Sequence, residues 1–281
     1  MANKFWVGGT GTWDATTTTH WDDASGGAGG DAAPGVNDIA IFDAASGGGT
    51  VTVTWASGTV TCQGITTGAY TGHLDFSTSD NNVTLTAAGG WNGSGSGTRT
   101  ISLGDGVWTL SASSGTPWNM STVTGLVAFN CNGSTINMTG NTTSAIAFAG
   151  GGQTYNIVNF GPNSSLGGYS ISGNNTFATL GVTAPTTLVI VVASTQIITN
   201  AFTWTGTASN HINVLSSATS GATVGTISSA NNGTVIWGAI RGITCSGGGT
   251  FTGTNAINAG QNSGITITPP AAGTGGSVVG G

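Results

Sequence analysis

Five short segments between Val51 and Ala112 decide the fold, because each alternates apolar and polar residues over the length of a β-strand. They are VTVTW (51–55), HLDFS (73–77), NVTLTA (82–87), RTISLG (99–104) and VWTLSA (107–112). A period of two turns one side of each segment toward a core and the other toward water. The sequence therefore predicts short, half-buried strands.

The same pattern continues toward the C-terminus in six further segments: GLVAFN (125–130), AIAFAG (145–150), YNIVNF (155–160), TLVIVV (187–192), AFTWTG (201–206) and TVIWGAI (234–240). Gly, Asn and Ser fill almost every gap. No window combines the helical period with helix-forming residues, so we expect very little helix. If the Val127 side chain in GLVAFN points inward, we expect Val127→Asp to destabilise the protein by several kcal/mol, because the change buries an unpaired charge.

The stronger apolar clusters recur about every 20–25 residues, which is the length of one coil of a β-solenoid. We expect an all-β parallel β-helix body over 51–268, with roughly ten coils of about 22 residues. A Trp- and Asp-rich cap or anchor over 1–50 precedes it, and a flexible Pro/Gly tail over 269–281 follows. Tandem antiparallel β-sandwich domains are the alternative, because they also show short alternating strands.

The composition suits such a fold. Of 281 residues, 51 are Gly, only 4% are charged and none is Glu, whereas average chains carry about 25% charged residues. The apolar fraction of 37% still provides a core, so disorder is a poor interpretation. In stacked coils, outward Thr, Ser and Asn need only face water.

Charge and cysteine content exclude several classes of function. Nine Asp stand against Lys4, Arg99 and Arg241, which gives a net charge of −6 and no basic patch for nucleic acid. The three cysteines are far apart and in no CxxC spacing, so we expect neither a disulfide framework nor a zinc site. We also expect no signal peptide and no membrane insertion, because the longest apolar run, 188–193, is too short to span a bilayer.

Both ends of the chain carry a resemblance. The segments FWVGGTGTWD (5–14), HW (20–21), PGVNDIAIFD (34–43) and the closing segment at 231–267 resemble β-helical surface proteins of bacteriophages and of some bacterial adhesins. The resemblance implies a right-handed β-helix that serves as a tail fibre, tailspike or head-decoration protein, often as a homotrimer bound to other virion proteins. It implies a virion location, which also fits a chain without an export signal, and it implies no catalytic residues.

The distribution of acidic residues argues against an enzyme. Glycoside hydrolysis usually needs two neighbouring carboxylates, and residues 106–281 contain none. Asp75 with Asp80, or Asp22 with Asp23, could pair, but such residues more often form turns. His20, His73 and His211 occur without a GxSxG motif, and no phosphate-binding loop is present. We expect no catalytic activity and no cofactor.

One motif points to a metal. GGAGGD at 26–31 matches half of a calcium-binding β-roll repeat, with further Asp residues nearby. Calcium β-rolls need tandem copies, and this match occurs once. A loop without a metal is the favoured interpretation.

Aromatic residues of the head have two interpretations. Phe5, Trp6, Trp13 and Trp21 lie near several Asp residues, so they could anchor the rod to a partner or stack on a host surface glycan. Alternatively, they cover the first coil, since an uncapped solenoid end exposes unpaired strand edges. In the body, the candidates for glycan contact are Trp118, Trp204 and Trp237. The two functions that remain are a structural virion component and a receptor-binding adhesin.

Overall fold

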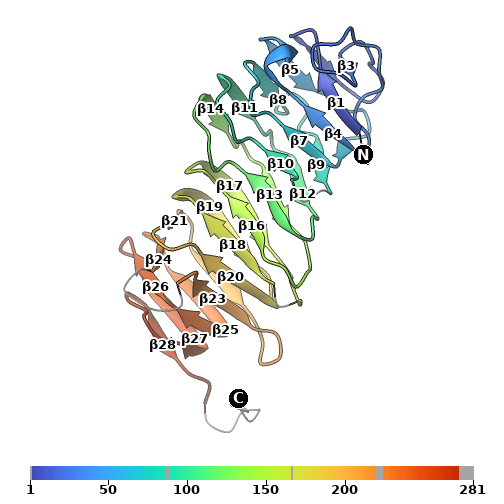
Figure 1. Cartoon of the computed structure of the whole chain (residues 1–281). Helices are drawn as coiled ribbons and strands as arrows, with labels where there is room; N and C mark the ends of the chain where they lie inside the picture. The colour runs from blue at the N-terminus through green and yellow to red at the C-terminus, as the bar shows by residue number, and fades with distance from the viewer. Residues whose placement is uncertain (1, 87–88, 166, 219–223, 272–281) are drawn as a thin grey trace.

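The computed structural model describes residues 2–86, 89–165, 167–218 and 224–271. Strands stack along one axis into a rod, with the N-terminal strands at one end and the C-terminal strands at the other (Figure 1). The only helix in these ranges is a single 3-10 turn, η1 (Ala44–Ser46), which Asp43 caps. The predicted β-helix is confirmed, because neighbouring strands pair in parallel throughout, apart from one antiparallel pair in the head.

The largest sheet has 14 strands and runs from end to end. Its strands are β1 (Ala2–Trp6), β3 (Trp21–Asp22), β4 (Asp38–Ile41), β7 (Gly64–Thr66), β10 (Trp91–Asn92), β13 (Gly115–Asn119), β16 (Ile146–Ala149), β18 (Tyr169–Ser172), β20 (Thr186–Ile190), β22 (Phe202–Thr205), β23 (Ile212–Ser216), β25 (Gly233–Arg241), β27 (Phe251–Asn258) and β28 (Thr266–Thr268).

Two further sheets complete the coils. The sheet of five strands contains β2 (Gly11–Trp13), β5 (Thr50–Val53), β8 (His73–Asp75), β11 (Arg99–Ser102) and β14 (Leu126–Asn130). The sheet of nine strands contains β6 (Thr59–Cys62), β9 (Asn82–Leu85), β12 (Val107–Leu110), β15 (Thr135–Met138), β17 (Thr154–Phe160), β19 (Asn175–Val182), β21 (Thr195–Ile198), β24 (Gly225–Ser228) and β26 (Ile243–Ser246).

As far as β14 the chain visits the three sheets in turn, and from β15 on it moves between the sheets of 14 and nine strands, so each coil rests on the one before it. In the N-terminal half β4, β5 and β6 make one coil, and β7, β8 and β9 stack on them strand by strand. Toward the C-terminus, single long strands turn a corner. β25 does so at Trp237, which has a φ of 57°. The head belongs to the same stack, because β1 pairs with β4 and β2 pairs with β5.

Coil length is not uniform. Side-chain hydrogen bonds between stacked coils join Asn137 to Asn159, 22 residues apart, Thr187 to Asn213, 26 apart, and Thr234 to Thr252, 18 apart. The expected length of about 22 residues describes some coils but not all. The reason is that strand pairing fixes only the segments on the faces, while the connections between them tolerate insertions.

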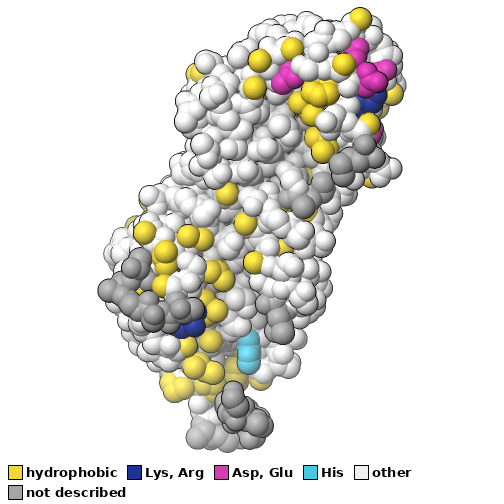
Figure 2. All heavy atoms as spheres, viewed as in Figure 1, with side chains coloured by type: hydrophobic (Ala, Val, Ile, Leu, Met, Phe, Trp, Pro, Cys, Tyr) yellow, Lys and Arg dark blue, Asp and Glu magenta, His cyan; other side chains and the backbone are white. Residues whose placement is uncertain are grey.

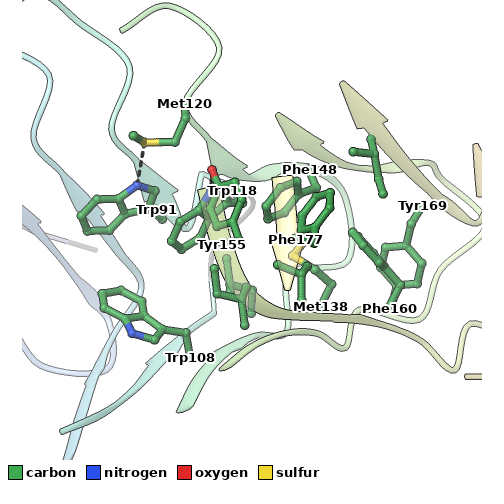
Figure 3. Close-up of a cluster of buried hydrophobic side chains, with 14 of the residues drawn as sticks. Trp91, Trp108, Trp118, Met120, Met138, Phe148, Tyr155, Phe160, Tyr169 and Phe177 are labelled. Atoms are coloured by element: carbon green, nitrogen blue, oxygen red, sulfur yellow. Dashed lines mark hydrogen bonds between the residues drawn. The ribbon is translucent and has the colours of Figure 1, made fainter. Parts of the chain in front are cut away.

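The core is a continuous column of inward side chains. Around the middle of the rod, Trp118 stacks on Trp91 and on Phe148, with ring centroids 5.5 and 5.9 Å apart, and its indole N–H donates to the Tyr155 hydroxyl at 3.0 Å (Figure 3). All four side chains are buried. Aromatic pairs in such geometries add stabilisation beyond the area they bury.

The alternation predicted from the sequence sets most inward positions. Val51 and Val53 of β5 are both fully buried, while the threonines between and before them are partly exposed. The GLVAFN segment forms β14, but Val127 points outward, with 68% of its surface exposed. The inward orientation considered for Val127 is therefore wrong, and Phe129 of the same strand packs against the core instead.

The predicted flexible tail begins after β28. Residues 269–271 are described, and 272–281 lie outside the described residues.

Candidate attachment and binding surfaces

The head closes the N-terminal end of the rod. After β2 the chain returns across this end and forms β3, which pairs antiparallel with the outer edge of β1 at Phe5↔Asp22 and Trp6↔Trp21. On its other edge, β1 pairs with β4. Because β3 occupies the last edge of the largest sheet, that edge offers no long run of unpaired backbone groups to another chain.

The tryptophans of the head are core residues, not surface residues. Trp6, Trp13 and Trp21 are each 0% exposed, and their rings meet edge to face, with centroids 5.2 Å apart for Trp6 and Trp21 and 5.3 Å for Trp13 and Trp21. Phe42 lies against all three rings. Of the four aromatics suggested for anchoring or glycan contact, only Phe5 keeps part of its surface in solvent. The three indoles cover the first coil, so direct contact with a partner is wrong for them.

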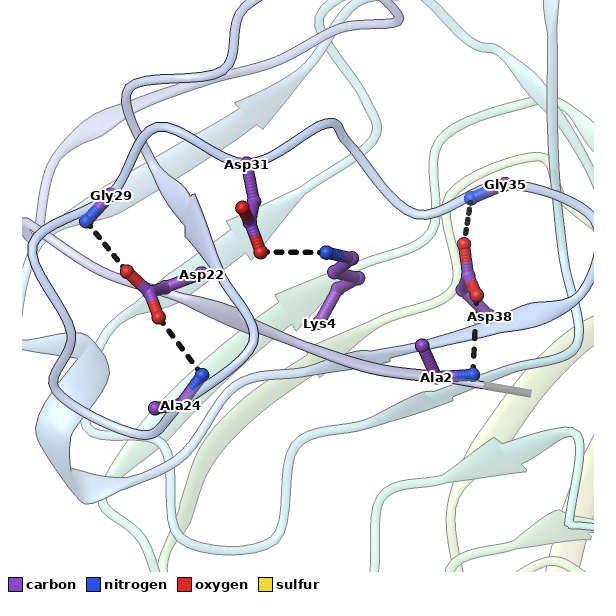
Figure 4. A network of polar contacts seen from close by, with 8 residues as sticks. All are labelled: Ala2, Lys4, Asp22, Ala24, Gly29, Asp31, Gly35 and Asp38. Carbon is purple, nitrogen blue, oxygen red and sulfur yellow. Dashed lines mark hydrogen bonds and ion pairs between the residues drawn. The ribbon is translucent and has the colours of Figure 1, made fainter.

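Acidic residues gather on the surface of this end. Six of the nine Asp lie between Asp14 and Asp43, and Figure 2 shows Asp side chains, in magenta, grouped at the N-terminal end of the visible face. Lys4 forms an ion pair with Asp31 at 2.7 Å (Figure 4). The head surface therefore has a net negative charge, whereas the body over 51–268 carries three Asp and two Arg.

The carboxylates of the head organise turns. Asp22 accepts hydrogen bonds from the backbone N–H groups of Ala24 at 2.9 Å and Gly29 at 3.0 Å (Figure 4). These bonds hold the pKa of Asp22 below its usual value, the one from Ala24 most strongly, because they favour the charged carboxylate. Asp38 accepts hydrogen bonds from the N–H groups of Ala2 at 3.2 Å and Gly35 at 3.1 Å.

The GGAGGD segment lies in a loop, as favoured from the sequence. Gly26, Gly29 and Gly30 all have positive φ, and Asp31 at its end is the partner of Lys4. A Cβ on Gly29 would lie 2.1 Å from the Thr19 carbonyl oxygen, so only glycine fits there. No group of three potential metal-binding side chains occurs within the described ranges.

Asp75 and Asp80, one of the two pairs considered for acid–base catalysis, have separate partners. Asp75 accepts from the hydroxyls of Ser77 and Thr78. Partial burial raises the pKa of Asp75, but hydrogen bonds from Ser77 and Thr78 outweigh it, so this pKa lies below its usual value. Asp80 accepts from the backbone N–H of Asp105 in the next coil, at 2.8 Å. Asp75 therefore stabilises a turn, and Asp80 links two stacked coils.

Two polar arrangements escaped the sequence analysis. His73 Nε2 lies 2.9 Å from the Ser102 hydroxyl, to which Asn130 also donates at 3.1 Å, but Ser102 is only 4% exposed. Arg99 is 1% exposed and donates to the carbonyl oxygens of Gly97, at 2.7 Å, and Gly93. Burial lowers the pKa of Arg99. The alternation of β11 places Arg99 on the same side as Ile101, and this was the signal that could have found it.

The body tryptophans are also mostly internal. Trp118 is fully buried and Trp204 is 2% exposed, so neither can stack on a glycan. Trp237 is half-buried at the corner of β25. Cys62, Cys131 and Cys245 are all free.

A polar hollow of about 120 Å³ lies on the side of the rod, where the chain enters β18, β20 and β23. Asn163, Thr187, His211 and Asn213 are among the residues that line it. They come from three successive coils, so no local motif in the sequence announces the hollow.

Searches against protein-family models, curated proteins and solved structures find no match for this chain. Within the described ranges, the chain has no helix of the length and hydropathy needed to cross a bilayer.

Proposed function

We propose that this chain is a non-enzymatic structural rod of a bacteriophage particle, of the head-decoration, tail-fibre or tailspike class. The observation that carries the proposal is the shape: stacked parallel coils whose buried core extends from Trp6 to Ala256. Residues 106–281 carry Arg241 as their one formal charge, so the surface there consists of uncharged groups. The sequence resemblance at 5–43 and 231–267 supplies the link to phage particles.

The two ends of the rod differ in a way that suits attachment at one of them. The head end is closed by β3 and the buried indoles. At the other end, β28 pairs only with β27 among the described strands, and Ile257 is 51% exposed. Exposed strand edges offer unpaired backbone groups to another chain. We therefore place the attachment at the C-terminal end, in place of the Trp-rich head.

We further propose that the rod works as a homotrimer. Side-by-side packing of neutral Thr, Ser and Asn faces removes few charges from water, so its desolvation cost is low. Sedimentation of the purified protein should give three times the chain mass of 27.4 kDa. A stable monomer at micromolar concentration would contradict the trimer.

The central test is whether the chain occurs in purified particles of a phage that encodes it, measured by mass spectrometry. Absence from the particles refutes the structural role.

An antibody against the head loop at 23–31 should label intact particles if the C-terminal end is attached. Ile257→Asp, at the open end, should reduce incorporation, while Val127→Asp is the matched control on the side of the rod. Equal incorporation of both variants would move the attachment elsewhere.

The second candidate function is a receptor-binding adhesin for host glycan. For this function, we move the proposed glycan site from the head aromatics to the side of the rod. The indoles at 6, 13 and 21 are internal and cannot stack on a sugar. The observation that favours this function is the polar hollow beside His211.

A further inference from the structure

The hollow on the side of the rod is built from three coils that stack in register. Asn163 and Ser164 lie in the connection from β17 to β18, Pro185 and Thr187 at the start of β20, and His211 just before β23. The backbone fixes their spacing, because the Asn163 N–H donates to the Pro185 carbonyl at 2.8 Å and the Thr186 N–H donates to the His211 carbonyl at 3.1 Å. The site is therefore held open by the coil itself.

Asn163 is the side chain that points to a ligand. It is 4% exposed, and its Oδ1 accepts from the Ser165 N–H at 3.1 Å. Its Nδ2 is buried and has no hydrogen-bond partner among the described residues. A buried amide donor without a partner costs about 1–3 kcal/mol, so native proteins rarely keep one without a reason. Because Asn163 lines the hollow, a rotation of its amide toward the hollow would let Nδ2 donate to an acceptor placed there.

The other lining groups leave both donors and an acceptor available. The Thr187 hydroxyl accepts from Asn213 at 3.2 Å, and the Ser164 hydroxyl accepts from Asn141 at 3.1 Å, so each keeps its own proton to donate. His211 Nε2 lies 3.1 Å from the Ala208 carbonyl, which can only accept. In the neutral ring the proton therefore sits on Nε2, and Nδ1 is left as an acceptor.

Charge selects the class of ligand. None of the eight residues that line the hollow carries a formal charge when His211 is neutral. The nearest formal charge along the paired strands is Arg241, which lies opposite Leu215 and does not line the hollow. A phosphate or carboxylate would find no cation there. A ring with several hydroxyl groups, each both donor and acceptor, matches the mixed set.

We propose that this hollow binds one neutral sugar unit, with Asn163, Ser164 and Thr187 as donors and His211 as acceptor. His211 is exposed on the side of the rod, where a glycan chain could reach it. The proposal does not depend on how the rod is attached to a particle, since it concerns the purified chain.

The test uses the three histidines as probes. In full-length protein labelled at histidine, methyl glycosides of glucose, galactose, mannose and N-acetylglucosamine are titrated while the imidazole NMR signals are followed. At least one glycoside should move the His211 signal in a saturable way. The His20 signal, from a ring stacked on Trp6, and the His73 signal should stay in place. Sodium glucuronate and inorganic phosphate should cause no saturable shift.

Variants connect the signal to the hollow. Thr187→Val and Ser164→Ala should each weaken binding about tenfold, the equivalent of one hydrogen bond. Thr109→Val, a partly exposed threonine of β12 away from the hollow, is the control and should bind as the unmodified chain does. The site is refuted if no neutral glycoside moves His211, if phosphate or glucuronate binds more tightly, or if both variants bind normally. None of these results affects the presence of the chain in particles, so the two proposals fail separately.

Discussion

Removing the indole of Trp118 should weaken the rod more than most single changes in this chain. Trp118→Ala takes away a fully buried ring that stacks on Trp91 and Phe148. Trp-to-Ala changes in cores cost about 3–5 kcal/mol, because the remaining structure does not fill the cavity. The Tyr155 hydroxyl loses one donor but still donates to the Gly150 carbonyl at 2.8 Å, so no polar group is orphaned. We expect about 4 kcal/mol.

The assay is guanidinium and thermal unfolding, followed by far-UV circular dichroism. For a domain of this size, a loss of about 4 kcal/mol lowers Tm by roughly 8–16 °C. Val127→Ala is the control, since its side chain is 68% exposed and surface changes stay within about 0.5 kcal/mol. Trp118→Phe keeps a stacked ring and should fall between the two. A Tm for Trp118→Ala within about 2 °C of the unmodified chain would refute the role given to this aromatic column.

Three further predictions concern the register of the strands, stability at low pH and the reactivity of the cysteine thiols. Ile101→Asp should cost several kcal/mol in the same unfolding assay, whereas Val127→Asp should be tolerated, because the first side chain is buried and the second exposed; equal effects would contradict the register. The pKa of Asp75 lies below its unfolded value, so its contribution to stability is present above about pH 4 and is lost as the pH falls further. Between neutral and acidic pH, Tm should therefore fall less for Asp75→Asn than for the unmodified chain, and an identical fall in Tm would contradict this prediction. Burial raises the pKa of the Cys62 thiol to about 12, so at pH 8 a thiol reagent should label the half-buried Cys131 first and Cys62 only after unfolding; prompt labelling of Cys62 would count against the packing described.

Which side of a strand faces the core could be predicted only where the alternation is clean. In VTVTW the two valines alternate with threonine, and both valines are buried. In GLVAFN, residues 126–129 are all apolar, so either register would bury an apolar set. Packing against β11 decides which side of β14 faces the core, and it leaves Val127 in solvent.

The candidate site was harder to predict than the fold. The sequence favoured Trp13 as part of a cap over the first coil but left a surface role open, because an indole is both large and polar at one edge. Its environment depends on β3 crossing the end of the rod, a contact that alternation does not encode. The hollow was not predicted at all, since Asn163, Thr187 and His211 meet only because the coils between them have particular lengths.

The sequence by itself determined that this chain forms strands, that they recur at the length of a solenoid coil, and that its surface carries little charge. These properties follow from local periodicity and composition, which act on each segment separately. Only the tertiary structure decided that Trp6, Trp13 and Trp21 are internal, that Arg99 is buried, and which end of the rod is closed. The physical reason is that burial depends on what stacks above and below each coil. That is set by the length of the connections at the corners, where Gly, Asn and Ser allow many conformations and leave no periodic signal.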